Sequence, residues 1–452
     1  MAAAIGLLVM GALLTGIVGN RWGSTQWQGP LLDEGWSAYQ AGDADRLSRV
    51  VTALQKQTDS SAAANLLEGA LLIVTGQPAS ALDSLNQVPL TSEAGLRARQ
   101  LAALAYYQLN HLRDAQLVLV DLVQADPDNL DARRLLGALY YDLGANPQAI
   151  EQLQRVVSER PNDVQAWRLI GLMKQDFQQF TDAAAAYREA LRGADGKTVT
   201  AASLPASSVR PFGPTISEPE RIDLRLQLAR CELELKQFSA ALATAQPLPV
   251  GEARDAILLI ANAALGQSDT AAEIAASYQE LSRVNSPEIC RALADYWDDR
   301  DDTLRAESWY RRSLELSPCD FVVRYRLARI LKRMHRDQEA ETESARSRED
   351  QMLTERLHEL QEESFNRPTD SALRIEMGEI ALLMMQADLA KAWFEAALGL
   401  DPNNPAARQA LQELDPRPDL NQLIERRKRL FRTRMDPFGR GASEPPPMKT
   451  QP

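Results

Sequence analysis

Residues that carry catalytic chemistry are scarce in this chain. Its 452 residues include only three histidines, His111, His335 and His358, which lie far apart in the sequence. The chain lacks His-Glu-x-x-His, Gly-x-Ser-x-Gly, Gly-x-x-x-x-Gly-Lys and Gly-x-Gly-x-x-Gly, the motifs of zinc hydrolases, serine hydrolases, phosphate-binding loops and dinucleotide-binding folds. These absences argue against an enzyme. We therefore predict no catalytic residue, no metal ligand and no cofactor.

Cysteine is equally rare. Cys231, Cys290 and Cys319 are widely separated, and no Cys-x-x-Cys pair occurs. An odd number of cysteines cannot complete a disulfide framework, and these spacings do not fit a zinc or haem site. We expect the three cysteines to be small residues buried in helix packing.

Acidic residues outnumber basic residues over most of the chain. Lys and Arg total 50 against 62 Asp and Glu, which gives a net charge of −12. From Arg417 onward the balance reverses, with nine basic and four acidic residues, so the tail carries +5 and the remainder −17. An acidic body argues against general affinity for nucleic acid, and we expect no nucleic-acid partner.

A repeat with a constant period is the strongest positive signal. Gly35, Gly69, Ala103, Gly137 and Gly171 are spaced 34 residues apart, and similar neighbours surround each of them. A period of this length is typical of stacked helix–turn–helix units, which form an extended solenoid. Such a chain presents a long surface, so its default role is to bind something.

The unit that starts at Leu130 shows the repeated pattern most clearly. Counting Leu130 as position 1, the pattern comprises Leu136 at 7, Gly137 at 8, Tyr140 at 11, Ala149 at 20, Leu153 at 24 and Pro161 at 32. Small residues at 8 and 20 let two helices cross closely, and proline ends the second helix because it lacks an amide donor. This pattern closely resembles the tetratricopeptide repeat.

The resemblance extends over about ten units and implies an all-α fold, a right-handed superhelical solenoid of about ten antiparallel helix pairs. We predict an N-terminal array over 28–197 and a C-terminal array over 220–414 that ends in a capping helix. Between them, 198–219 belongs to a stretch rich in Gly, Ala, Ser, Thr and Pro, which indicates a flexible insertion. The alternative is a segment that folds across the groove or onto a partner. A charged insertion over 341–366 should lengthen the second helix of its unit.

Residues 1–20 are predicted to be a transmembrane anchor that precedes the solenoid. Ala2 to Gly19 contains no charged residue and reaches the lower end of the length that spans a bilayer. Trp22 and Trp27 follow, where interfacial aromatic residues are expected. The alternative is a cleaved signal sequence, which the missing basic region at the start disfavours. We expect a single-pass membrane protein with its repeats outside the cytoplasm.

In the tetratricopeptide family, positions 2, 5, 9 and 12 of the first helix line the concave face. The resemblance therefore implies a partner-binding groove with seven polar side chains from three consecutive units: Arg97, Gln100, Tyr107, Arg134, Tyr141, Arg168 and Gln175. Arginine and tyrosine offer directional hydrogen bonds and planar contact area, which suits an extended peptide with a carboxylate. Repeats that clamp the carboxyl terminus of chaperones carry asparagine at position 9, and this chain has none there.

The tail contains a second candidate contact. Residues 420–435 (LNQLIERRKRLFRTRM) mix basic and apolar residues, with a basic run at Arg426, Arg427, Lys428 and Arg429. Such a pattern fits anionic lipid or an acidic protein surface. Alternatively, the segment folds back onto the acidic solenoid as a cap.

These features favour a non-enzymatic scaffold that binds proteins or peptides in a groove at a membrane. In layout the chain also resembles bacterial membrane-anchored repeat proteins that scaffold envelope assembly, without the paired Cys-x-x-Cys module that ends one such group. A secreted or periplasmic binding module follows if residues 1–20 are cleaved, and an accessory subunit of an enzyme complex is the remaining alternative. The sequence gives no signal for the oligomeric state.

Overall fold

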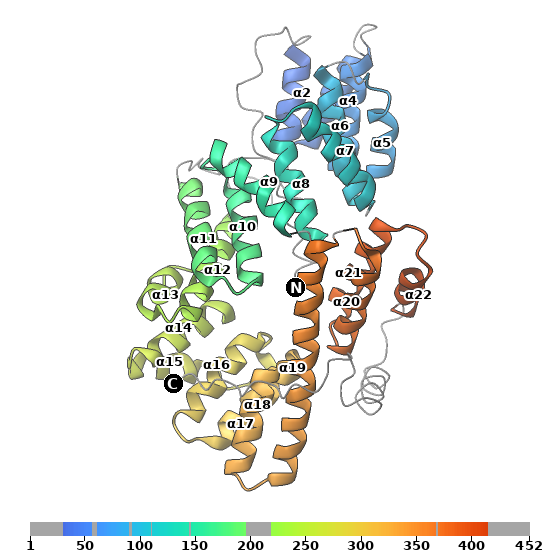
Figure 1. Cartoon of the computed structure of the whole chain (residues 1–452). Coiled ribbons are helices and arrows are strands. Elements are labelled where there is room, and N and C mark those ends of the chain that lie inside the picture. The colour runs from blue at the N-terminus through green and yellow to red at the C-terminus, as the bar shows by residue number, and fades with distance from the viewer. Residues whose placement is uncertain are drawn as a thin grey trace.

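A computed structural model describes residues 30–56, 61–89, 93–109, 111–143, 146–195, 218–367 and 369–414. This part of the chain contains 21 α-helices, one short 3-10 helix and no strand. Twenty of the helices form ten successive pairs, and the last helix is single (Figure 1). The predicted all-α solenoid of about ten helix pairs is confirmed. None of the described helices combines the length and the apolar content that a bilayer span requires.

The first five pairs lie before the long insertion. Their bounds are α2 (Pro30–Ala41) with α3 (Ala44–Gln55), α4 (Ser61–Val74) with α5 (Pro78–Leu85), α6 (Glu93–Gln108) with α7 (Leu112–Ala125), α8 (Leu130–Asp142) with α9 (Asn146–Glu159), and α10 (Val164–Asp176) with α11 (Phe180–Asp195).

Five pairs and a single helix follow the insertion. Their bounds are α12 (Glu218–Glu234) with α13 (Phe238–Ala245), α14 (Glu252–Ala264) with α15 (Ser268–Ser277), α16 (Pro287–Asp298) with α17 (Thr303–Leu316), α18 (Phe321–Arg333) with α19 (Asp337–Asn366), α20 (Ser371–Leu383) with α21 (Ala387–Leu400), and α22 (Pro405–Glu413). The 3-10 helix η1 (Leu281–Arg283) lies between α15 and α16. Helix α19 is 30 residues long, as the charged insertion predicts.

The turn between repeats is built from the sequence Pro-x-Asp or Pro-x-Asn. At 127–129 the Asn129 side chain accepts from the Ala132 amide at 3.0 Å and thereby caps α8. The Pro127 carbonyl accepts from Arg133 Nε at 2.8 Å. The same two bonds recur at 161–163, 318–320 and 402–404, where the side chain six residues after the proline is Trp167, Arg324 or Arg408. Each cap contributes about 1 kcal/mol and fixes where the next repeat begins.

The turn within a repeat adopts a left-handed conformation at position 15. Gly42, Gly76 and Gly266 occupy it with φ between 68° and 76°. In five other repeats a residue with a side chain takes the same conformation: Gln178, Lys236, Asp301, His335 and Met385, with φ between 55° and 59°. The backbone geometry of the turn is therefore conserved between repeats that do not share its glycine.

Close helix crossing explains the small residues at positions 8 and 20. Every alanine at position 20 is buried: Ala81, Ala115, Ala149, Ala183, Ala241, Ala271, Ala306, Ala340 and Ala390. A Cβ added at Gly137 would lie 2.7 Å from Leu153 Cγ, and one at Gly171 would lie 2.6 Å from Tyr187 Cε1. Gly137 and Gly171, both at position 8, are thus in close contact with position 24 of their own repeat, and a methyl group added to either would displace that side chain.

The array does not extend as an open rod. From α8 to α18 the chain follows a curved path, and α19 then runs back toward its middle, so that α20 and α21 lie next to α7 and α8 (Figure 1). Contacts between α21 and α7 confirm this arrangement, and Ala396 and Leu400 of α21 belong to the same core as Leu112 of α7 and Leu139 of α8. The described solenoid therefore closes on itself.

We predict that Gly171→Ala destabilises the fold. The new methyl group meets a tyrosine ring that is fully buried, so overpacking should cost about 1–3 kcal/mol, more than the ~1 kcal/mol that alanine gains in helix propensity. Urea unfolding followed by circular dichroism measures the change. Gly251→Ala is the matched control, because Gly251 has an extended backbone and open space around its Cα. Equal midpoints for both variants would contradict this packing argument.

Candidate functional site

The seven predicted groove residues lie on three successive first helices. Arg97, Gln100 and Tyr107 are on α6, Arg134 and Tyr141 are on α8, and Arg168 and Gln175 are on α10. Residues of α6, α8 and α10 share one core, which holds these helices in register. Five of the seven side chains bond to residues of a neighbouring helix or repeat, as described below. Their partner-binding role stays a prediction, and the structure assigns most of them a role inside the array.

Arg134 is the centre of a buried ionic cluster. Only 3% of it is exposed, and its guanidinium contacts Asp163 Oδ2 at 2.7 Å and Asp131 Oδ1 at 3.1 Å. Asp131 also accepts from Arg160 Nη1 at 2.8 Å. Burial raises the pKa of Asp131 above its ordinary value, and the two arginines act in the opposite direction. The cluster joins α8 to the turn that precedes α10, and its charges are largely balanced.

Arg168 connects the repeats on either side of the long insertion. Its Nη2 donates to Asp223 Oδ2 at 3.2 Å, and its Nη1 lies 3.9 Å from Glu220 Oε1. Gln165 Nε2 donates to the same Glu220 oxygen at 3.4 Å. Both acidic residues are on α12, so these contacts bridge positions 55 residues apart in the chain. The two halves of the array are therefore held together by polar contacts from α10 to α12.

The tyrosines form a ladder from each repeat to the next. Tyr107 Oη donates to Asp142 Oδ2 at 2.5 Å, and Tyr141 Oη donates to Asp176 Oδ2 at 2.7 Å. Each pair is 35 residues apart, which joins position 12 of one repeat to position 13 of the following one. Burial raises the pKa of Asp142 to about 7, and the hydrogen bond from Tyr107 offsets this only in part. Arg333 and Asp298 make the same link near the other end of the array, with the acid at position 12.

Gln175, Arg97 and Gln100 are the remaining predicted residues. Gln175 Oε1 accepts from Tyr187 Oη at 2.8 Å, and its Nε2 donates to Gln227 at 3.3 Å. The Arg97 guanidinium lies over the Trp36 ring, 4.6 Å from its centroid. Gln100 is half-buried. Residues 1–20 and the basic residues Arg426, Arg427, Lys428 and Arg429 lie outside the described part of the chain.

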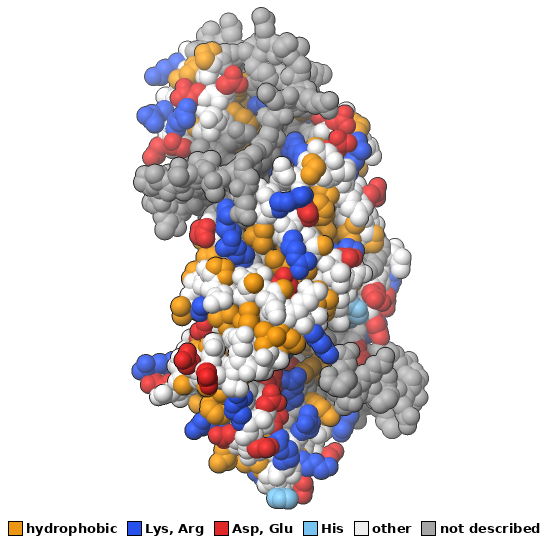
Figure 2. Space-filling view, turned by 90° about the vertical axis from the view of Figure 1, so that its left-hand side faces the viewer, with side chains coloured by type: hydrophobic (Ala, Val, Ile, Leu, Met, Phe, Trp, Pro, Cys, Tyr) orange, Lys and Arg blue, Asp and Glu red, His pale blue; other side chains and the backbone are white. Residues whose placement is uncertain are grey.

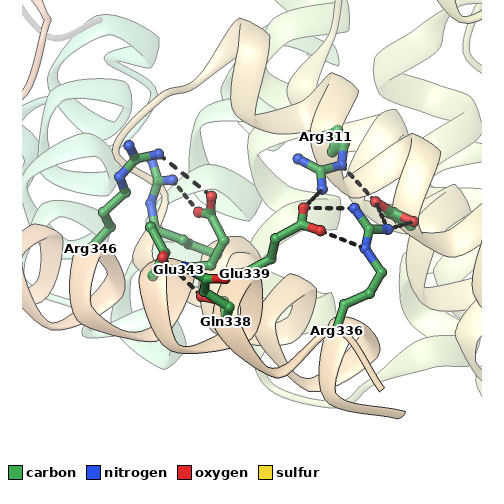
Figure 3. A network of polar contacts seen from close by, with 9 residues as sticks. Arg311, Arg336, Gln338, Glu339, Glu343 and Arg346 are labelled. Carbon is green, nitrogen blue, oxygen red and sulfur yellow. Dashed lines mark hydrogen bonds and ion pairs between the residues drawn. The ribbon is translucent and has the colours of Figure 1, made fainter. Parts of the chain in front are cut away.

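Charged side chains on α17 and α19 form a second polar network (Figure 3). Arg336 contacts Glu307 at 2.7 Å and Glu339 at 2.6 Å, and Arg311 contacts the same two carboxylates at 2.8 and 3.2 Å. Figure 2 shows acidic and basic side chains interspersed over one face of the molecule. In this network each charge is paired with an opposite one, so it carries no large excess of either sign.

No group of three or more potential metal ligands occurs among the described residues. The three cysteines are free and buried, as the sequence predicts. In this part of the molecule the candidate site is therefore a surface made of helices, without the arrangement of a metal centre.

Sequence reasoning missed the acidic partners of the groove residues. Asp142 and Asp176 follow their tyrosines by 35 residues, a spacing that the 34-residue period makes detectable. Asp163 was identifiable as an N-cap but not as a partner of Arg134. Asp223 had no such signal, because the insertion separates it from Arg168.

The fold defines the class of the protein as an all-helical solenoid of repeated antiparallel helix pairs. A family model described as the tetratricopeptide repeat matches residues 106–173, from the end of α6 into α10, and supports this repeat as the unit of the array. Tetratricopeptide repeat proteins typically mediate protein–protein interaction, and their solenoid is generally a non-enzymatic scaffold. No curated protein matches the sequence significantly.

Several solved structures are similar to this chain. MamA has 22% sequence identity, with 36% of this chain and 95% of that chain covered and a TM-score of 0.31. The PilF protein of Pseudomonas aeruginosa has 14% identity over 56% of this chain and 88% of its own, with a TM-score of 0.32. The APC/C hetero-tetramer Cut9–Hcn1 has 13% identity over 83% and 68% of the two chains, also with a TM-score of 0.32.

We predict that Asp142→Asn removes part of the pH dependence of stability. The pKa of this carboxyl is about 7 when folded and about 4 when unfolded, so the folded protein retains a proton that the unfolded chain releases between these values. Stability contributed by Asp142 is therefore lost as the pH rises from about 4 to about 7, by at most ~1.4 kcal/mol per pH unit.

Urea unfolding of both proteins at a series of pH values measures this difference. As the pH rises through this interval, the free energy of unfolding of the native protein should fall relative to that of the variant. All other carboxyls are common to both proteins, so the difference reports on Asp142. Parallel profiles would show that Asp142 titrates normally in the folded protein.

Proposed function

We propose that this chain is a non-enzymatic scaffold that binds protein or peptide partners along its first helices. In this proposal the face is formed by α6, α8 and α10, and residues 1–20 hold the array at a membrane. The observation that carries the proposal is the inter-repeat ladder. Tyr107, Tyr141 and Arg134 each bond to the following repeat or its leading turn, so three helices are fixed relative to one another. A face fixed in this way is preorganised for a partner.

The internal ion pairs refine the chemistry of the proposed partner. Arg134 and Arg168 are paired with Asp163 and Asp223, so the face does not carry the free positive charge that the sequence alone suggests. We therefore propose recognition through hydrogen bonds and shape rather than through an acidic motif. The half-buried Gln100 amide supplies a donor and an acceptor. The Tyr141 hydroxyl and the Gln175 amide are bonded within the array and offer a partner only their remaining hydrogen-bonding capacity.

We predict that photo-crosslinking identifies this face. Benzoylphenylalanine placed at Gln100 or Tyr141 should capture the same partner protein from membranes that contain the full chain. Charge reversal at Arg134 is a poorer probe, because a glutamate there would lie among buried carboxylates and disturb folding. Circular dichroism checks that each variant keeps its helical content.

Gln154 provides the matched control. It is exposed and lies on α9, the second helix of its repeat. The probe at Gln154 should give no adduct, or a different one. Adducts of the same protein in equal yield from Gln154 and Tyr141 would contradict docking on the first helices.

We predict that removal of residues 1–20 releases the protein from membranes. The segment supplies the longest uncharged stretch of the sequence, so the full chain should resist extraction by high salt and the shortened chain should not. Fractionation of cells that express each form measures this. An intact N-terminus on the membrane-bound form, read by mass spectrometry, supports an anchor. A form that lacks residues 1–20 and is free of the membrane would support the secreted alternative.

A further inference from the structure

The last repeat returns to the middle of the array by means of α19. With 30 residues, this helix is about 45 Å long, roughly twice the length of the other second helices. Its C-terminal half packs on α20 through the buried residues Leu353, Leu360 and Met377. Because α19 is so long, the pair α20–α21 lies away from the preceding repeats and next to α7 and α8 (Figure 1).

The first closing contact joins the end of α21 to the start of α7. Ala396 and Leu400 are each 6% exposed and belong to the core cluster that contains Leu112. Gly399 lies directly against Leu112, since a Cβ added at position 399 would be 2.9 Å from Leu112 Cβ. Only glycine allows this approach, although Gly399 meets no residue of its own repeat as closely.

The second closing contact joins α20 to the end of α8. The Arg374 side chain donates to the carbonyl of Leu143, the C-cap residue of α8, and no part of Arg374 is exposed. A guanidinium is favoured at this position because the C-terminus of a helix carries a partial negative charge. A third contact places the His358 ring of α19 6.5 Å from the Phe177 ring at the end of α10.

These contacts differ from those between sequential repeats. They involve helix ends rather than whole helix faces. Burial withdraws the Arg374 guanidinium from water and thereby lowers its pKa to about 10. In a solenoid, stability comes mainly from each repeat and its nearest neighbours, so the loss of this contact leaves those neighbours in place.

We propose that the last repeat is a reversible latch, which closes the array into a ring when α20 and α21 dock on α7 and α8. Release moves α20 and α21 as a unit with the end of α19 and exposes the apolar side chains of Leu112, Ala396 and Leu400. Closure limits the access of a partner to Leu112 and the other side chains that α20 and α21 cover. This consequence rests on the proposed scaffold function, whereas the latch itself is a property of the chain alone.

Small-angle scattering of Gly399→Leu tests the latch without any partner. Leucine favours the helix, and the atoms nearest to a Cβ added at position 399 belong to Leu112 across the closing contact, so helical content should be retained while the radius of gyration and maximum dimension increase. Ala406→Leu, an exposed small-to-large change in α22, should leave the scattering unchanged. Equal dimensions for the native protein and Gly399→Leu would overturn the proposal, whether both are compact or both are extended.

If Gly399→Leu fails to fold, a pair of introduced cysteines tests the same closing contact. Leu112→Cys with Gly399→Cys should form an intramolecular disulfide under mild oxidation, because the two Cβ positions lie within about 1 Å of disulfide geometry. The native cysteines are buried and should not compete. No bond in the folded double variant would show that the contact does not form in solution.

The same cysteine pair tests whether the closing contact opens reversibly. In low urea the native protein should expand before it loses helical content, and the disulfide should abolish this early expansion. Simultaneous expansion and loss of helix in the native protein would show a permanent interface instead of a latch. A failed scaffold proposal would leave all these results unchanged, so the two proposals fail independently.

Discussion

The close crossing of two helices within each repeat is the constraint on which the rest of the structure depends. Gly137 and Gly171 contact the side chain at position 24 so closely that no methyl group fits, and alanine is buried at position 20 in nine of the repeats. This crossing fixes the angle between the paired helices. Repeats that share this close crossing stack in a similar way, and polar bonds between them fall at equivalent positions.

Those polar bonds carry the register from one repeat to the next. The ladder from Tyr107 to Asp142 and from Tyr141 to Asp176 uses side chains that the period places one unit apart. Apolar packing alone is weakly directional, whereas a buried hydroxyl must meet its acceptor in one orientation. Residues that resemble a ligand-binding set therefore also hold the face together, which is why the arginines and tyrosines of the groove are largely buried.

The period made the helix pairs predictable, since it depends on local spacing at positions such as Gly171 and Pro161. It also predicted the C-terminal array over 220–414, in which the turns at Lys236 and Gly266 have the same left-handed conformation as those before the insertion. The ion pairs of Arg168 were not predictable, because they cross an insertion whose length sets no register. Nor was the contact between Arg374 and Leu143, which depends on the curvature accumulated over the intervening repeats. Small rotations at each repeat decide whether distant helices meet, and no single residue encodes their sum.

The curvature of the array also explains where the extra turns of α19 pack. A helix that grows within a repeat cannot lengthen its own packing face beyond its partner, so its extra turns must either project into solvent or find another surface. In this chain the extra turns pack on α20 and carry the last repeat to α7 and α8. Without these turns the last repeat would contact only the repeat before it. With them it also contacts α7 and α8. The curved array therefore has two kinds of interface: the continuous stacking of each repeat on the next, and the local contact of α20 and α21 with α7 and α8. Only the local contact can open without unfolding a repeat.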